Sequence, residues 1–332
     1  MPTFHIVNDP WLDVLYSDGE TKTVSLGKLL SDLHQIERIS ESSPLTEVAL
    51  LRFLIALLSD GLRELVPTED VWLPFVERCQ SGLPAQAIDA ILEPLMASPD
   101  VLAADHSGFF DGPSVRRVPG WDAPNAKQPV SRFLPELPTG TNLAHFVHLA
   151  DDSAALCVAC LLKSRAVDAA FARGGLGPSL SRNLLATISG TEPRYVVLTA
   201  ASLLDTLLIN LLTGDASRPS WVSIHQRQAG NPGPVARMSW RPRLMLPTTA
   251  ADTRLPCVSC ATTTQLRFID SVMLDTYNHS GSPFGSKDDI ENWKGSGRDP
   301  HLLPVVKNEL SLGLSPLEWP LRALSRLLGG DL

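Results

Sequence analysis

The sequence has no hydrophobic run long enough to cross a membrane. A transmembrane helix needs about 20 consecutive apolar residues, and the longest candidate, Val48 to Leu58, is shorter and contains Arg52. The first residues also lack the basic segment followed by an apolar stretch that marks a secretory signal. We therefore expect a cytoplasmic protein without a membrane anchor.

Recognisable catalytic motifs are also absent. The sequence contains no phosphate-binding loop, no Gly-x-Ser-x-Gly, no His-Glu-x-x-His and no dinucleotide-binding fingerprint. His145 and His148 are three residues apart, but no carboxylate motif accompanies them. We therefore expect a protein that is not an enzyme. The alternative is a hydrolase with an unrecognised site built from His145, His148 and Asp151.

Charged residues are scarce, at 19%, and they are unevenly distributed. The net charge of −8 is the sum of −12 for residues 1–159 (10 basic, 22 acidic), +6 for 160–270 (12 and 6) and −2 for 271–332 (6 and 8). A chain that coats nucleic acid by itself is usually basic throughout. Contact with nucleic acid is thus expected only in the middle of this chain, unless the asymmetry is ordinary surface variation.

The pattern of apolar residues predicts a mixed α+β fold. A hairpin is expected near the N-terminus, with a turn at Asp18-Gly19, and Ser43-Pro44 is typical of a helix start. Further helices are expected over 26–36, 68–95, 154–171, 199–212 and 319–328, and strands over 214–256. The chain of 332 residues suits one large domain or two modest ones. We expect a single domain, mainly helical over 1–150 and β-rich over 151–332.

Four of the five cysteines form two Cys-x-x-Cys pairs, Cys157 with Cys160 and Cys257 with Cys260. Each such pair turns two thiolates toward one metal ion, and two pairs complete a tetrahedral shell, so the sequence predicts a structural zinc site. The alternatives are a redox dithiol or chance pairs of reduced cysteines. Because about 97 residues separate the pairs, the site would join distant parts of one domain. Cys79 stands alone and is expected to be buried as an apolar residue.

A glycine-rich segment follows the first cysteine pair. It runs from Phe171 to Gly177 and includes Arg173, with Arg182 nearby. Glycine allows a backbone to approach a phosphate or a nucleic-acid groove closely, although glycine-rich loops most often form turns.

Several short motifs occur in a characteristic order along nearly the whole chain. They are Phe4–Val14 with Gly19 and Val24–Leu26, then Glu47–Leu54, Thr141–Val147, Ala155–Cys160, Ala172–Gly177, Leu203–Leu212, Pro219–Trp221, Trp240–Pro242 and Pro256–Cys260. This order resembles the CasA family, the large subunit of the type I-E CRISPR surveillance complex, Cascade. The resemblance implies the N-terminal-domain fold of that subunit, with its zinc site of four cysteines, and a role in antiviral defence.

The resemblance implies a subunit that lies at the 5′ end of the CRISPR RNA (crRNA). It would recognise the PAM, the short motif that flanks the target in double-stranded DNA, and start R-loop formation. By position, a loop with Asn142, His145 and Phe146 would contact the crRNA and the neighbouring backbone subunit. The residues expected to face the PAM are Gly174, Gly175 and Gly177, with Arg173 and Arg182 as phosphate contacts. The other expected partners are the crRNA 5′-end and small subunits.

Three departures from the family pattern bear on this interpretation. Residues 261–286 contain no lysine, whereas some family members have a lysine finger after the second cysteine pair, and Arg267 is the only cation there. The glutamine that parts the duplex and the C-terminal four-helix bundle would lie beyond residue 332. We expect a short form, or a bundle supplied by another chain, and leave helicase-nuclease recruitment open. The alternative is a zinc-stapled scaffold subunit without nucleic-acid contact.

Overall fold

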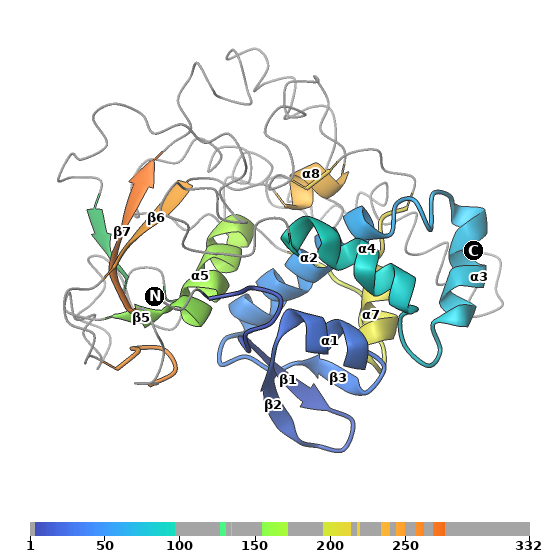
Figure 1. Cartoon of the computed structure of the whole chain (residues 1–332), viewed down its shortest axis with the longest axis horizontal. Helices are drawn as coiled ribbons and strands as arrows, with labels where there is room; N and C mark the ends of the chain where they lie inside the picture. The colour runs from blue at the N-terminus through green and yellow to red at the C-terminus, as the bar shows by residue number, and fades with distance from the viewer. Residues whose placement is uncertain are drawn as a thin grey trace, which may run out of the picture.

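The computed structural model describes residues 4–96, 127–130, 134, 155–171, 195–213, 218–219, 234–239, 244–249, 256–261 and 268–275. In Figure 1 a sheet from the N-terminal residues lies at the bottom, a second sheet lies at the left, and helices lie between and beside them. This mixture of helices and antiparallel strands agrees with the predicted α+β class.

The N-terminal sheet consists of β1 (Leu12–Tyr16), β2 (Thr21–Val24) and β3 (Ile36–Ile39), in the order β2-β1-β3 with antiparallel pairing. Alternate side chains of β1 are buried, as expected for a sheet with one face on the core. Gly19 has a φ of +87° in the β1–β2 turn, a conformation that favours glycine. The predicted hairpin is therefore confirmed, whereas β3 was not predicted.

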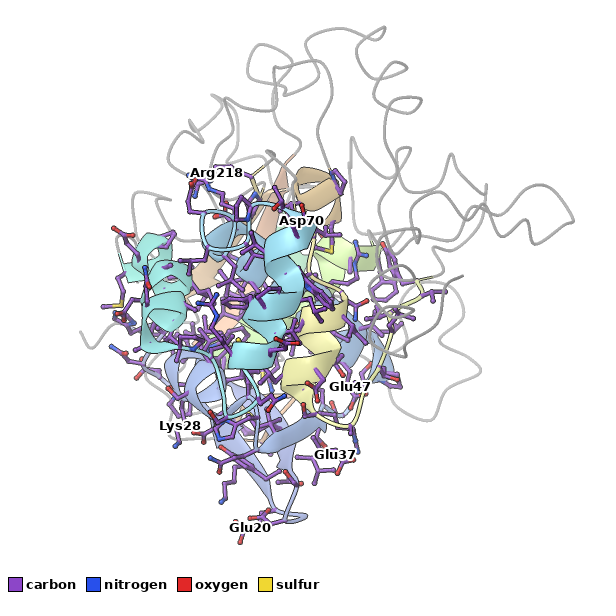
Figure 2. The ribbon with its side chains drawn as sticks, turned by 90° about the vertical axis from the view of Figure 1, so that its right-hand side faces the viewer. Glu20, Lys28, Glu37, Glu47, Asp70 and Arg218 are labelled. Carbon is purple, nitrogen blue, oxygen red and sulfur yellow. The ribbon has the colours of Figure 1, made fainter. Side chains whose placement is uncertain are left out.

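Helix α1 (Leu26–Asp32) follows β2 directly. Ser25 caps it, because the Ser25 hydroxyl accepts a hydrogen bond from the backbone N–H of Lys28. The helix predicted here extends to residue 36, but α1 ends at Asp32 and β3 begins four residues later. The outer rim of this region carries charge: Figure 2 shows Glu20 at the hairpin tip and Lys28 on α1 at the periphery.

Helix α2 (Pro44–Gly61) is the centre of the core. It begins at the predicted residue, with Ser43 as N-cap and Pro44 in its first turn. Most of its side chains are buried, and it packs against α4, α5, α7 and α8. At its end Gly61 meets α4 so closely that a β-carbon there would lie 2.6 Å from the Ile91 α-carbon. Glycine is therefore required where the two helices cross.

Arg52 lies within α2 and is 2% exposed. Its guanidinium donates to the backbone oxygen of Met238, at 3.2 Å, and lies 4.0 Å from the centre of the Tyr195 ring. A charge placed inside an apolar helix is thus accommodated by a carbonyl oxygen and an aromatic face. These contacts also connect the N-terminal helix to parts of the chain more than 140 residues away.

Helices α3 (Glu69–Arg78) and α4 (Ala85–Met96) occupy the region predicted as helical over 68–95. A turn divides them, and Gly82 within it has a φ of +118°. Cys79 follows α3 and is fully buried, as predicted, and burial raises the pKa of its thiol to about 11. This region therefore contains two helices, and the sequence pattern did not resolve the break.

Two further short helices are α7 (Leu203–Ile209) and α8 (Pro234–Met238). The Trp72 indole donates to the backbone oxygen of Leu208, which joins α3 to α7. Helix α8 falls in a stretch predicted to be β-rich. Among the described residues of that stretch, α8 departs from the prediction and the strand over Leu244–Thr249 agrees with it. No helix in the part of the chain that the structure describes is long and apolar enough to span a membrane.

The second sheet is arranged around β7 (Phe268–Asp275). It pairs antiparallel with β4 (Lys127–Pro129), β5 (Leu156–Cys157) and β6 (Leu244–Thr249). Its four strands come from four separate stretches of the sequence, and each is short. Strand β5 ends at the first cysteine of the first Cys-x-x-Cys pair, so this sheet places that pair in space.

Candidate metal centre

The first cysteine pair lies where β5 joins α5 (Val158–Phe171). Cys157 is the last residue of β5, and Cys160 lies in the first turn of α5. Both cysteines are buried. Because the strand passes directly into the helix, the first helical turn brings the two thiols to the same side of the junction.

The second pair lies in a tight turn over residues 257–260. The backbone N–H of Ala261 donates to the Cys257 oxygen at 2.8 Å, and Ala261 closes the turn with a φ of 56°, in the left-handed region. The Val258 N–H donates to the Ala155 oxygen at 2.9 Å, beside a bridge between Ala155 and Cys257. These backbone bonds attach the turn to the start of β5.

The two pairs come together in one cluster, which we call the four-cysteine cluster: Cys157, Cys160, Cys257 and Cys260. All four Sγ atoms lie within 4.8 Å of one another, and the Sγ atoms of Cys157 and Cys260 are 3.7 Å apart. Zinc–sulfur bonds of about 2.3 Å in a tetrahedron require sulfur–sulfur separations of about 3.8 Å. The residues present therefore fit a tetrahedral metal ion, and the prediction that the pairs lie together is confirmed.

The thiols perturb one another at these distances. Hydrogen bonding with Cys157 raises the pKa of Cys160 but lowers the pKa of Cys257. The Cys257 sulfur also accepts from the backbone N–H of Cys157, at 3.4 Å. Several thiolates this close together repel one another unless a cation lies between them, so the cluster is suited to a soft divalent metal ion.

Exposure differs within the cluster. Cys157, Cys160 and Cys257 are buried, whereas Cys260 is exposed at the outer edge of the second turn. A cavity of about 180 Å³ lies beside Cys160 and Cys260, and its wall includes Asp13, Glu41 and Lys163. The cluster therefore has one side against the core and one side that opens to this polar cavity.

The three charged residues of that wall were missed by the sequence analysis. Lys163 contacts the carboxylates of Asp13, at 2.6 Å, and Glu41, at 2.7 Å. Burial lowers the pKa of Lys163, but the charges of Glu41 and Asp13 outweigh this and raise it to about 12. Burial raises the pKa of Glu41 more than Lys163 lowers it. The signal available in the sequence is a lysine that directly follows the apolar stretch from Val158 to Leu162.

The predicted nucleic-acid contacts lie outside the described residues. This applies to the predicted crRNA loop, with Asn142, His145 and Phe146, and equally to His148 and Asp151. It also applies to the predicted PAM-facing set, which is Arg173, Gly174, Gly175, Gly177 and Arg182. These residues therefore remain predictions, and the four-cysteine cluster is the predicted site that the structure describes.

The fold and the cluster together define a class of protein: a mixed helix-and-sheet domain in which four cysteines join two distant stretches of the chain. The family model described as CRISPR-associated protein Cse1 matches residues 6–278. This match covers most of the chain, and the chain belongs to the Cse1 family. The resemblance to CasA, another name used for this family, is thereby confirmed.

Individual relatives agree with this assignment. CasA/Cse1 from Thermus thermophilus is 30% identical over 225 residues, which cover 66% of this chain and 42% of the relative. The crystal structure of Cse1 from Thermobifida fusca has a TM-score of 0.59 at 21% identity and covers 82% of this chain and 51% of that one. A structure titled CRISPR RNA-guided surveillance complex has a TM-score of 0.56 at 15% identity, with coverage of 91% and 60%. The chain thus matches about half the length of these relatives.

Proposed function

We propose that this protein is the large subunit, or the N-terminal part of the large subunit, of a type I-E CRISPR surveillance complex. The carrying observation is the Cse1 family match over residues 6–278. It is supported by a fold similar to Cse1 structures, one of which belongs to a CRISPR RNA-guided surveillance complex. In this role the subunit binds near the crRNA 5′ end and recognises the PAM of target DNA to start R-loop formation.

The nucleic-acid contacts in this proposal come from two loops. Asn142, His145 and Phe146 contact the crRNA and a neighbouring subunit, and Gly174, Gly175 and Gly177 approach the minor groove of the PAM. Arg173 and Arg182 bind phosphates. Glycines and phosphate contacts suit a reader of the minor groove, because that groove offers few distinguishing groups and is recognised largely by width and close approach.

The four-cysteine cluster holds a zinc ion in this proposal, and its role is structural. Four thiolates fill all four positions of tetrahedral zinc, which leaves none for water or a substrate. In this proposal the zinc is therefore not catalytic and the subunit is not an enzyme, and the cluster joins the chain before α5 to the turn over 257–260. Elemental analysis of the purified protein should give one zinc per chain. Iron at the same thiolates would instead give a coloured protein with charge-transfer bands in the visible spectrum.

Co-purification with RNA tests the nucleic-acid role. The tagged protein is co-expressed with its genomic neighbours and a CRISPR array, and the bound RNA is sized on a gel. A discrete RNA of about 60 nucleotides, recovered with other subunits and lost with Phe146→Ala, supports the proposal. Met96→Ala, at an exposed apolar residue of α4, is the matched control and should retain the RNA. Zinc-loaded protein without RNA or partners would contradict the proposal and favour a zinc-stapled scaffold.

A further inference from the structure

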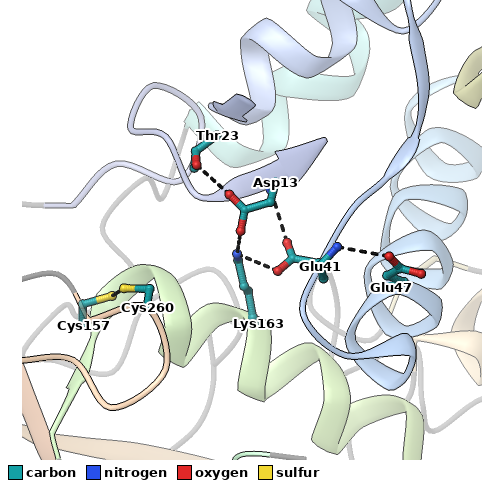
Figure 3. Close-up of polar contacts among 7 residues, drawn as sticks. All are labelled: Asp13, Thr23, Glu41, Glu47, Cys157, Lys163 and Cys260. Carbon is teal, nitrogen blue, oxygen red and sulfur yellow. Dashed lines mark hydrogen bonds and ion pairs between the residues drawn. The ribbon is translucent and has the colours of Figure 1, made fainter. Parts of the chain in front are cut away.

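A buried ion network joins the first cysteine pair to the N-terminal sheet. Lys163 extends from α5 toward β1 and the connection between β3 and α2, where Asp13 and Glu41 receive it (Figure 3). Its partners lie 150 and 122 residues away in the sequence. The Lys163 side chain is 14% exposed and that of Glu41 4%, whereas that of Asp13 is 33% exposed. The network is therefore a long-range contact made largely away from solvent.

Both carboxylates are held in place from the N-terminal side. The second oxygen of Glu41 accepts from the Asp13 backbone N–H, and the second oxygen of Asp13 accepts from the Thr23 hydroxyl. The Glu41 backbone N–H in turn donates to the Glu47 carboxylate on α2. The N-terminal sheet and α2 thus fix the point at which a cation must sit, independently of α5.

Polar contacts add direction to the packing of α5. The side chains of α5 that the structure describes are buried, apart from the partly exposed Lys163 and Phe171, and the buried ones include Ser164, Arg165 and Asp168. Hydrophobic burial has no preferred direction, so the polar side chains of α5 constrain its rotation more than burial of its apolar ones does. Charge-assisted hydrogen bonds do have a direction. Cys160 precedes Lys163 by three residues and shares its helix face, so fixing Lys163 also fixes Cys160.

We propose that Lys163 is a positioning residue, which sets the rotation of α5 and so aligns the first cysteine pair with the second. The effect of Lys163 on nucleic-acid binding rests on the proposed function. Phe146 lies ten residues before β5, and Arg173 lies two residues after the end of α5. A rotated α5 would therefore change where the chain leaves the helix toward Arg173, in the segment proposed to contact the PAM.

The test separates positioning from simple stability. Lys163→Met alone leaves two carboxylates without their cation, one of them buried, and should lower the melting temperature. The triple variant Asp13→Asn, Glu41→Gln, Lys163→Met removes all three charges, while the new amides still accept from Thr23 and from the backbone of residue 13. Replacing a whole buried ion network by hydrophobic residues of similar volume is often neutral for stability, and the triple variant likewise leaves no unpaired charge buried. The triple variant should thus regain the melting temperature.

Two measurements report the position of α5 and its cysteines rather than the stability of the fold. One is the rate at which a chromogenic chelator removes zinc from the protein. The other is the affinity of the assembled crRNA complex for duplexes with a matched target and randomised flanking positions. We expect Lys163→Met and the triple variant to release zinc about tenfold faster and bind duplex about tenfold more weakly, in line with other residues that orient metal ligands. Lys28→Met, which removes a surface lysine of α1 paired with Asp32, should change neither readout.

A triple variant with wild-type melting temperature, zinc release and duplex affinity would overturn the proposal. If that variant does not fold, Lys163→Arg and Lys163→Met are compared instead. Faster zinc release from the methionine variant but not from the arginine variant supports the positioning role. Equal rates of zinc release from the two variants overturn the proposal. The zinc readout also separates this inference from the proposed function. A wild-type complex that binds no duplex contradicts the proposed function, whereas the difference in zinc release still decides the role of Lys163.

Discussion

Two regions of the molecule are held together in different ways. The first, which we call the N-terminal body, is residues 4–96, where consecutive elements pack around α2 with many fully buried aliphatic side chains. The second, which we call the cysteine-linked part, comprises residues 155–171, 256–261 and 268–275. In it a two-residue strand and an exposed turn meet through a few backbone bonds and four sulfurs.

The difference shows what each region needs in order to fold. The N-terminal body buries enough apolar surface, from neighbouring stretches of chain, to be stable by packing. The turn over 256–261 buries little besides Cys257, since its other residues are exposed. Its attachment must therefore come from the metal and from a few hydrogen bonds. We therefore expect the two regions to differ most when the metal is removed and least when a single hydrogen bond is changed.

Removing the metal should have the largest effect and should affect one region. Binding at four-cysteine sites contributes on the order of 10 kcal/mol in small zinc domains. Chelation, or Cys257→Ser, should abolish hydrogen-exchange protection in residues 155–157 and 256–261, while the N-terminal body, and α5 where it packs against α2, keep their protection. Cys79→Ala, a buried cysteine outside the cluster, should lower the melting temperature but leave the zinc content unchanged. Protection lost equally in both regions would show that they do not differ.

A cavity created in the N-terminal body should affect both regions, unlike removal of the metal. Leu54 on α2 is fully buried, and Leu54→Ala should destabilise the protein by about 3–5 kcal/mol. Because α5 packs against α2, this change should lower the protection of both regions together. Hydrogen exchange measured with zinc bound checks this. Loss confined to the N-terminal body would mean that the cysteine-linked part is stable without it.

An ion pair at the end of α2 joins the N-terminal body to a distant residue, and its loss should have a smaller effect. Arg218 donates two hydrogen bonds to Asp60, both at 2.9 Å, and the Asp60 side chain is 4% exposed. Hydrogen bonding with Asp60 raises the pKa of Arg218. Since Arg218 is itself 24% exposed, Arg218→Met should cost about 2 kcal/mol in chemical denaturation rather than the larger value for a fully buried pair. Lys22→Met, at an exposed pair with Glu20, should leave the stability essentially unchanged, because solvent screens surface ion pairs.

The sequence predicted the features that local patterns determine. The two Cys-x-x-Cys pairs, the turn at Gly19 and the helix start at Ser43-Pro44 were all found, because each depends on residues only a few positions apart. Strand β3 and the break at Gly82 were missed, since packing partners decide them. The network of Lys163 with Asp13 and Glu41 could not be found in this way, because no local pattern links residues more than 100 positions apart.

Tyr16 offers a hydrogen bond that belongs to the N-terminal body alone. Its hydroxyl donates to Asp32 at 2.7 Å, across the space between β1 and α1. Burial, followed by the hydrogen bond and the charge of Asp32, raises the pKa of Tyr16 to about 12. Asp32 also accepts from Lys28, so it keeps one partner when the tyrosine hydroxyl is removed.

The stability that Tyr16 contributes should fall as the pH rises. Because its pKa is raised from 10.0 to about 12 on folding, the contribution is complete below pH 10 and is lost as pH rises toward 12. Tyr16→Phe should cost about 1 kcal/mol at neutral pH, and the difference from wild type should shrink between pH 10 and 12. Urea denaturation across this range checks it. A difference that stays constant would mean that folding does not raise the pKa of Tyr16, and altered zinc content would contradict the independence of the two regions.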